Sequence, residues 1–221
     1  MKSKLYIQNE SKKIIIFFAG WGVDTNPFHK EILSSKKNIL FIYDYTGIEI
    51  SPELKEILSD DYYTEISVIA WSMGVMVANT LLQGHKLKNA IAINGTLEPI
   101  SDKYGIYERI FDLTINSFND ETAINFAKRM CLSDYNKYKE NFPERINLKE
   151  ELLSLKQYAQ NKNKSEKNIF TNVIISENDK IIPPKHQLDF WKTKGIIPKI
   201  LKDSPHFCFY THKLNWFIEL S

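Results

Sequence analysis

Six short runs rich in Ile, Val and Phe, most of them separated by helical patterns, constrain the fold of this chain more than any other feature. Continuous apolar runs are typical of strands covered on both faces, and their alternation with helices is typical of βαβ units. The sequence therefore predicts an α/β protein with a mostly parallel sheet and helices on both faces. The predicted strands are Ile14–Ala19, Ile39–Tyr45, Ile66–Ala70, Ala90–Asn94, Asn172–Ser176 and Lys199–Leu201.

The segments between these runs predict the helices and one insertion. An additional strand near Leu5–Gln8 is expected to pair antiparallel at one edge of the sheet. Residues 97–168 have helical periodicity and no convincing strand, which predicts a helical insertion. No linker or repeat interrupts the 221 residues, so we expect one domain spanning 1–221. Helices are predicted over Pro27–Ser34, Met73–Gln83, Pro184–Lys192 and Tyr210–Leu220.

Composition excludes several classes of protein. The 29 Lys and Arg against 27 Asp and Glu form no basic stripe, so nucleic acid is not expected as a partner. Two cysteines, Cys131 and Cys208, are too few for a disulfide framework or a four-thiolate zinc site, which predicts a reduced, cytoplasmic protein. The apolar stretch Ile14–Val23 has ten residues, whereas a membrane span needs about 20, and no cleavage pattern follows it. We therefore expect neither a membrane anchor nor a signal peptide.

The third run ends in a candidate nucleophile. Ala70-Trp71-Ser72-Met73-Gly74 lies between a predicted strand and a predicted helix. In that context G-x-S-x-G forms a sharp turn that projects the serine hydroxyl from the carboxyl edge of the sheet. The first position of this motif requires a small residue, and Ala70 fits there less well than Gly would. Ser72 could instead simply cap the helix.

A serine needs a base and an orienting acid at the same edge of the sheet. Where such an elbow occurs, the chain order is Ser, acid, His. Asp179 follows the fifth run and His206 follows the sixth, and the intervening 206 − 179 = 27 residues can hold one helix and one strand. Both loops should therefore open at the edge that carries Ser72. We predict these three residues to be catalytic.

Other residues are rivals for these roles. Asp203 lies only three residues before His206, Glu177 is expected to end a strand, and Asp179 itself could be a turn residue before Pro183. Cys208 could act as a thiol nucleophile, although buried packing is the favoured interpretation. His85, His186 and His212 lie on or beside predicted helices, where solvated positions are expected, and His29 lies in the first predicted helix.

Acyl transfer also requires hydrogen-bond donors for the developing oxyanion. The backbone N–H of Met73, directly after the nucleophile, is one candidate. The second candidate is the N–H of Trp21, in the loop Gly20-Trp21-Gly22 that follows the first run. The chain contains no sequence motif for a metal or a nucleotide, so we expect hydrolysis without a cofactor.

With these motifs in place, the chain resembles the α/β-hydrolases that demethylate pimeloyl-[acyl-carrier protein] methyl ester in biotin synthesis, especially the compact BioG type. The resemblance implies Ser72 as nucleophile, His206 as base, Asp179 as orienting acid, and the amides of Trp21 and Met73 as oxyanion donors. It covers most of the chain, including Tyr43-Asp44-Tyr45, residues 99–106 and Arg129-Met130-Cys131. Without the insertion of about 72 residues, roughly 149 remain, which implies a trimmed hydrolase core.

The insertion is the expected lid, and its charge changes sign along the chain. Residues 97–123 hold two cations and six acids, or −4, whereas residues 124–167 hold ten cations and six acids, or +4. Acyl carrier proteins are acidic, so a basic lid face could attract one, although such charges could equally form a solvated helix surface. Apolar lid residues could line an acyl channel or pack on the sheet. The candidate carrier-binding residues are Lys128, Arg129, Arg145 and Lys149.

Together with the motifs, this resemblance implies an esterase for the methyl ester of pimeloyl-[acyl-carrier protein]. Two alternatives stay open. One is a general short-chain esterase or thioesterase with the same triad. The other is a catalytically silent module that holds an acyl ligand.

Overall fold

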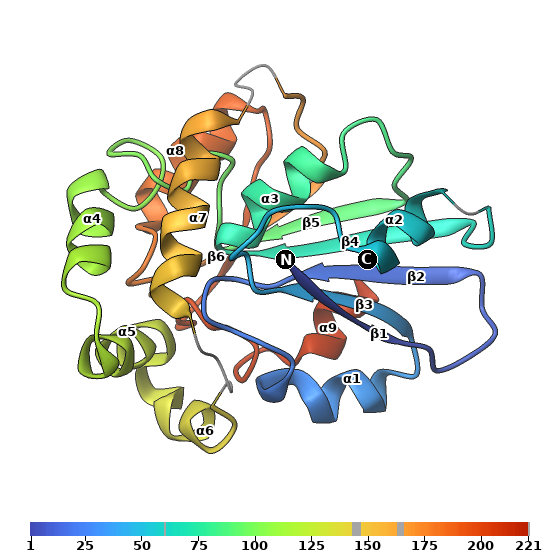
Figure 1. Ribbon diagram of the computed structural model, residues 1–221, viewed down its shortest axis with the longest axis horizontal. Coiled ribbons are helices and arrows are strands. Elements are labelled where there is room, and N and C mark those ends of the chain that lie inside the picture. The colour runs from blue at the N-terminus through green and yellow to red at the C-terminus, as the bar shows by residue number, and fades with distance from the viewer. Residues whose placement is uncertain (60, 143–146, 163–165, 221) are drawn as a thin grey trace.

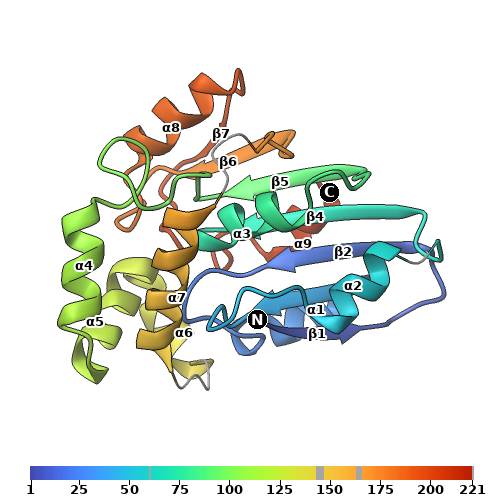
Figure 2. The ribbon, with the colours of Figure 1, turned by 45° about the horizontal axis from the view of Figure 1, so that its top comes forward.

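The computed structural model describes residues 1–59, 61–142, 147–162 and 166–220, and its centre is a seven-stranded sheet (Figure 2). The strand order is β1-β3-β2-β4-β5-β6-β7, with β1 antiparallel to β3 and the other neighbours parallel. The strands are β1 (Lys2–Tyr6), β2 (Lys13–Phe18), β3 (Asn38–Tyr43), β4 (Glu65–Trp71), β5 (Asn89–Ile93), β6 (Asn172–Ser176) and β7 (Lys199–Leu201).

The predicted strands are confirmed to within two residues, except for the leading strand at one edge of the sheet. The leading strand is antiparallel, as expected, but it covers Lys2–Tyr6 rather than Leu5–Gln8. Gln8 cannot continue the ladder because its backbone N–H and side chain are already bonded to Asn38 Oδ1 and the Ile32 carbonyl oxygen, respectively. Pairing with β3 therefore ends at Tyr6, which lies opposite Ile39.

Helices cover both faces of the sheet, because alternate residues of the buried strands point to opposite sides. Ile14, Ile16 and Phe18 of β2 belong to one apolar cluster, and Ile15 and Phe17 belong to the other. The first cluster is covered by α2 (Pro52–Ser59), α3 (Met73–Leu81) and α8 (Pro184–Thr193), and the second by α1 (His29–Ser35) and α9 (Leu214–Glu219) (Figure 1).

Two helix predictions need correction. The segment predicted as Pro27–Ser34 begins with a 3-10 turn (η1, Asn26–Phe28) before α1. The last helix is only Leu214–Glu219 rather than Tyr210–Leu220. Phe207 and Phe209 precede it as fully buried side chains, and the backbone N–H of Phe207 bonds to the Met130 carbonyl oxygen, so this stretch follows the core rather than a helix. Helix α2 was not predicted.

The insertion between β5 and β6 is helical, as predicted. Its helices gather beyond the arrowheads of the parallel strands, at the carboxyl edge of the sheet (Figure 1). They are α4 (Glu108–Asn116), α5 (Asp120–Cys131), the 3-10 turn η2 (Leu132–Asp134), α6 (Tyr135–Glu140) and α7 (Leu148–Asn161). No helix in the described part of the chain is long and apolar enough to cross a membrane.

Candidate active site

Ser72 lies on the sharp turn between β4 and α3. Its backbone has φ 57° and ψ −126°, a conformation that L-residues rarely adopt and that the surrounding packing must enforce. The turn brings α3 close to β2: a Cβ added at Gly74 would lie 2.4 Å from the Ala19 carbonyl oxygen. The serine therefore has the geometry of a nucleophile elbow, and the missing side chain of Gly74 permits this close approach.

The predicted base and acid meet Ser72 through two hydrogen bonds. The Ser72 hydroxyl lies 2.9 Å from His206 Nε2, and His206 Nδ1 lies 2.7 Å from Asp179 Oδ2. All three residues are buried, with 5%, 1% and 4% of their surfaces exposed for Ser72, His206 and Asp179. Parallel pairing of β4 to β5, β5 to β6 and β6 to β7 brings their loops to one edge. The structure thus assembles residues that lie 134 positions apart.

Asp179 is held by more partners than the sequence indicates. Its Oδ1 accepts the backbone N–H groups of Ile181 and Ile182 at 2.8 and 2.9 Å, and Gln187 Nε2 donates to Oδ2 at 2.8 Å. The Oε1 of Gln187 is buried without a hydrogen-bond partner among the described residues, a cost that accompanies its role in holding the acid. Gln187 was missed because a glutamine within a helical pattern carries no distinguishing signal.

The rival acids lie elsewhere. Glu177 and Asp203 are both exposed, and the Glu177 carboxylate accepts the backbone N–H of Asp203 at 3.2 Å. Neither has a hydrogen bond to His206 among the described residues. Asp179 is therefore the carboxylate in position to orient the imidazole.

Two buried side chains fix the backbone of the His206 loop. Trp71 Nε1 and Asn94 Nδ2 both donate to the His206 carbonyl oxygen, at 3.0 and 2.8 Å. Asn94 also binds Ser176, by its Nδ2 to the hydroxyl at 2.9 Å and its Oδ1 to the backbone N–H at 2.7 Å. One amide thus joins the ends of β5 and β6 to the His206 loop. Its position at the end of a predicted strand was the only signal in the sequence.

The other histidines do not contribute to this arrangement. His85 is exposed, as predicted, and His29 is exposed as well. His186 and His212 are instead half-buried: His186 Nδ1 lies 2.8 Å from the Gly105 carbonyl oxygen, and His212 Nε2 lies 3.1 Å from the Ser204 hydroxyl. Burial lowers the pKa of His212. Both make contacts between neighbouring segments of the fold.

The two residues predicted to donate to the oxyanion lie at the same pocket as Ser72 and His206. Trp21 and Met73 both line that pocket. Among the backbone hydrogen bonds of the described residues, none is donated by the N–H of Trp21 or of Met73. Met73 is the first residue of α3, where backbone N–H groups have no partner within the helix. Neither amide is therefore committed to a backbone acceptor among the described residues.

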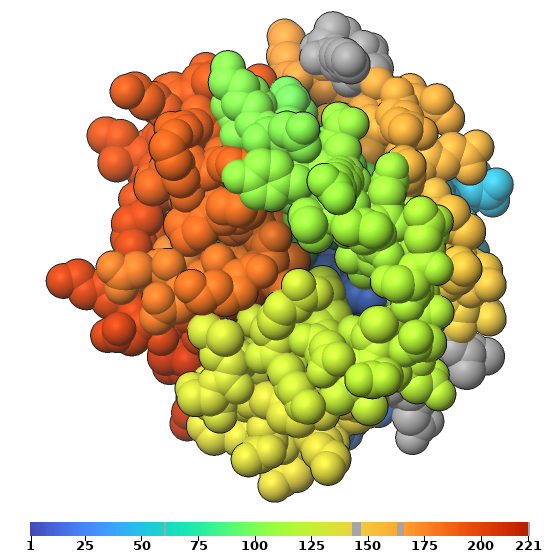
Figure 3. Space-filling view, turned by 90° about the vertical axis from the view of Figure 1, so that its left-hand side faces the viewer, coloured from blue at the N-terminus to red at the C-terminus, as the bar shows by residue number. Residues whose placement is uncertain are grey.

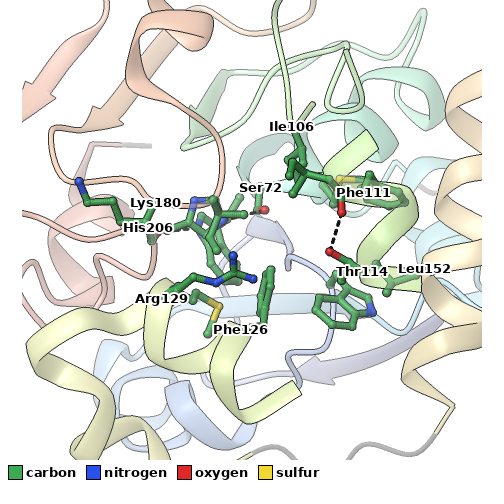
Figure 4. Close-up of a pocket in the computed structure, with 15 residues that line it drawn as sticks. Ser72, Ile106, Phe111, Thr114, Phe126, Arg129, Leu152, Lys180 and His206 are labelled. Atoms are coloured by element: carbon green, nitrogen blue, oxygen red, sulfur yellow. Dashed lines mark hydrogen bonds between the residues drawn. The ribbon is translucent and has the colours of Figure 1, made fainter. Parts of the chain in front are cut away.

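The pocket has a volume of about 590 Å³, including its open mouth, and a mostly apolar lining. Ser72 and His206 lie side by side in it (Figure 4). The insertion supplies most of the other walls. Its lining residues are Ile106, Ile110, Phe111 and Thr114 from α4 and the turn before it, Phe126, Arg129 and Met130 from α5, and Leu152 from α7. Phe118 packs edge-on against Trp21, and Leu155 is fully buried in the core.

The surface around the pocket carries cations, only some of which were predicted. Viewed from the side of the insertion, the molecule is hollowed between the helices, with part of the N-terminal segment visible inside (Figure 3). Arg129 and Lys180 are exposed and line the pocket. Lys128 is exposed beside the Tyr135 ring and Lys149 is partly buried, and neither is a lining residue; Arg145 lies outside the described residues. Lys180 was missed, although it directly follows Asp179.

Both cysteines are buried, and the described residues form no candidate metal site. Cys131 and Cys208 are free and fully buried. Burial raises the pKa of the Cys208 thiol to about 12, so the group stays protonated at neutral pH. Across the described ranges, no group of three or more His, Cys, Asp or Glu side chains could hold a metal ion.

Comparison with known proteins places this geometry in a class. The structure superimposes on the esterase from Exiguobacterium antarcticum with a TM-score of 0.68 over 99% of this chain and 92% of that one, at 12% identity, a likeness of fold alone. The sheet and the elbow, together with this match and the next one, define an α/β-hydrolase. The crystal structure of BioG from Haemophilus influenzae matches with a TM-score of 0.83 and 31% identity over 96% of each chain.

Sequence comparison gives the family. The family described as pimeloyl-ACP methyl esterase BioG matches residues 1–216. A Bacteroides fragilis protein named malonyl-[acyl-carrier protein] O-methyltransferase is 38% identical over 188 residues, which are 82% of this chain and 37% of that protein. The chain therefore belongs to the BioG family and is a hydrolase of the esterase type.

Proposed function

We propose that this chain is a serine carboxylesterase that hydrolyses the methyl ester of a pimeloyl group carried on acyl carrier protein, in biotin synthesis. The observation that carries the proposal is the hydrogen-bonded series of Ser72, His206 and Asp179 beside a mostly apolar pocket. The family description supports the substrate. A relative named for methylating a carrier-bound acid supports chemistry on a carrier protein.

In the first half of the reaction, the Ser72 hydroxyl attacks the carbonyl carbon of the methyl ester while His206 Nε2 takes its proton. The carboxylate of Asp179 keeps Nδ1 protonated and stabilises the imidazolium that forms. The amides of Trp21 and Met73 donate to the oxyanion of the tetrahedral intermediate. The bond to the methoxy oxygen then breaks, and methanol leaves with the proton from His206.

In the second half, water attacks the acyl group on Ser72 and gives its proton to His206. The bond to the serine oxygen breaks, His206 returns the proton to Ser72, and the free carboxylate is released. Apolar side chains such as Ile110 and Phe111 suit the methylene chain of the acyl group. No cofactor takes part in this scheme.

We further propose that residues 1–221 act as one catalytic domain with residues 97–168 as its lid. The exposed cations Arg129 and Lys180 at the pocket, with Lys128 beside Arg129 on α5 and Lys149 on α7, would attract the acidic carrier. Arg145 is proposed for the same surface from the sequence alone. The two free cysteines are compatible with a cytoplasmic location.

The direct test uses purified protein and carrier-bound pimeloyl methyl ester, with methanol and the demethylated carrier as the measured products. We expect turnover by the native chain and a loss of at least about 10³-fold in Ser72→Ala. Growth without biotin of a strain that lacks its own esterase for this ester should be restored by the native gene only. Turnover that is unaltered in Ser72→Ala would overturn the serine mechanism.

The choice of substrate is tested by comparing carrier-bound and free pimelate methyl esters. We expect a higher kcat/KM for the carrier-bound ester, and a lower ratio of the two values in Lys128→Ala and at high salt. Lys55→Ala, an exposed cation on α2, is the matched control. Equal efficiency on both esters would favour a general esterase. Failure of Ser72 to react with a fluorophosphonate would favour a silent binding module.

A further inference from the structure

A buried carboxylate of the insertion reaches the loop that carries the proposed oxyanion donor. Glu151 lies in the first turn of α7 and is fully buried. Its Oε2 accepts the backbone N–H of Gly22 at 3.1 Å, and its Oε1 accepts the backbone N–H of Tyr45 at 2.9 Å. Removing a carboxylate from water is costly, and these bonds offset part of that cost. Glu151 therefore ties α7 to the loops that follow β2 and β3.

The same loop is held at two further points. The indole Nε1 of Trp21 donates to the Leu148 carbonyl oxygen in α7 at 2.9 Å, and the Tyr45 hydroxyl donates to the Ala19 carbonyl oxygen at 2.8 Å. Residues 19–22 are thus fixed through the side chain of Trp21 and through the backbone on either side of it. These contacts restrain the loop on both sides of the Trp21 N–H, and two of the three come from α7.

We propose that Glu151 is a positioning residue that fixes the oxyanion loop, so that α7 forms part of the active-site frame as well as covering the pocket. The inference rests on the proposed function, because it assigns the Trp21 N–H to the oxyanion. An oxyanion donor is effective only when it lies about 2.7–3.1 Å from the developing charge, so a small displacement of the loop lowers the rate. The bond from Gly22 acts on the residue next to that donor.

The test replaces Glu151 by Gln, which keeps the shape of the side chain but offers one acceptor oxygen for two N–H groups. With a small p-nitrophenyl ester, we expect kcat to fall about tenfold or more while KM changes less than twofold. Affinity for a trifluoromethyl ketone, which forms a tetrahedral adduct on the serine, should fall by the same factor as kcat/KM. Glu150→Gln, the exposed neighbour on the same helix, should match the native chain.

A loss of thermal stability in Glu151→Gln with unchanged kcat and ketone affinity per folded molecule would overturn the proposal, because the residue would then act only on folding. If that variant does not fold, Tyr45→Phe removes the hydroxyl that holds Ala19 and should lower kcat and ketone affinity together, by a smaller factor. Unchanged values for Tyr45→Phe would also overturn it. The native chain and Ser72→Ala are assayed in parallel: a native chain as inactive as Ser72→Ala marks failure of the proposed function instead.

Discussion

The carboxyl edge of the sheet and the helical insertion above it build one pocket with different kinds of contact. At the sheet edge, buried hydrogen bonds hold each reacting group: Asp179 accepts two backbone N–H groups and the Gln187 amide, and the His206 carbonyl accepts Trp71 and Asn94. The insertion contributes apolar walls and exposed cations. The sheet edge therefore fixes the positions of Asp179 and His206, and the insertion forms most of the remaining pocket wall. Glu151 is an exception, because it belongs to the insertion but accepts buried hydrogen bonds from the loops that follow β2 and β3.

The largest effect is expected at the sheet edge. Asp179→Asn should lower kcat by about 10³ to 10⁴-fold with little change in KM, because Asn can leave His206 in the wrong tautomer. The measurement is ester hydrolysis at saturating substrate. Asp203→Asn, an exposed rival acid, is the control and should retain native activity. The assignment of the acid would be wrong if the Asp203 variant lost more activity than the Asp179 variant.

A smaller effect is expected where α3 approaches β2. Gly74→Ala should lower the free energy of unfolding by about 1–3 kcal/mol, because its new Cβ would meet backbone oxygens of Ala19 and Phe18 that cannot move separately from β2. Urea denaturation measures the loss. For Gly47→Ala we expect a near-native midpoint, since the nearest atom to an added Cβ is 3.8 Å away. Equal midpoints for the two variants would show that the elbow tolerates a side chain.

Within the insertion, polar contacts on the surface should matter less. Lys156 on α7 lies 2.5 Å from Asp112 on α4, but their side chains are 30% and 45% exposed. Breaking this pair should cost about 0–1 kcal/mol, and added salt should reduce the cost further. A double-mutant cycle of Lys156→Ala and Asp112→Ala, followed by urea denaturation, measures the coupling. Coupling well above that range would show that the insertion is held as firmly as the sheet edge.

The smallest effect is expected at the cysteines. Burial raises the pKa of both thiols, that of Cys208 to about 12, so at pH 8 the folded state keeps them protonated and shielded. Iodoacetamide should leave native protein unmodified and active, whereas both thiols should react after unfolding in urea. Mass spectrometry counts the adducts. Rapid modification of Cys208 with loss of activity in the folded chain would revive the thiol-nucleophile hypothesis.

Sequence patterns predicted the sheet edge well because its signals are local. A buried strand has a recognisable apolar run, and Ser72, Asp179 and His206 each lie in the loop or turn that follows such a run. The chain order and parallel pairing then bring the three loops together. Asn94 and Gln187 escaped prediction because their partners are the His206 carbonyl and the Asp179 carboxylate, which lie 112 and 8 residues away. Hydrogen bonds of this kind produce no periodic pattern in the sequence.

The helices of the insertion were expected from the sequence, but the contacts of their side chains were not predicted. Helical periodicity identifies an apolar face without saying whether that face meets the sheet or the pocket: Phe111 and Phe126 line the pocket, whereas Leu155 is buried in the core. Glu151 has no feature in the sequence that separates it from the neighbouring Glu150, which is exposed.

The sequence by itself determined the α/β class, the order of the strands along the chain, the helical insertion and the residues at the sheet edge, because strand runs and turn residues are local and periodic. Only the tertiary structure decided which acid faces His206, which residues of the insertion line the pocket and that Glu151 accepts the backbone N–H groups of Gly22 and Tyr45. The physical reason is that these are side-chain contacts between distant segments, and their geometry exists only once the helices have packed on the sheet.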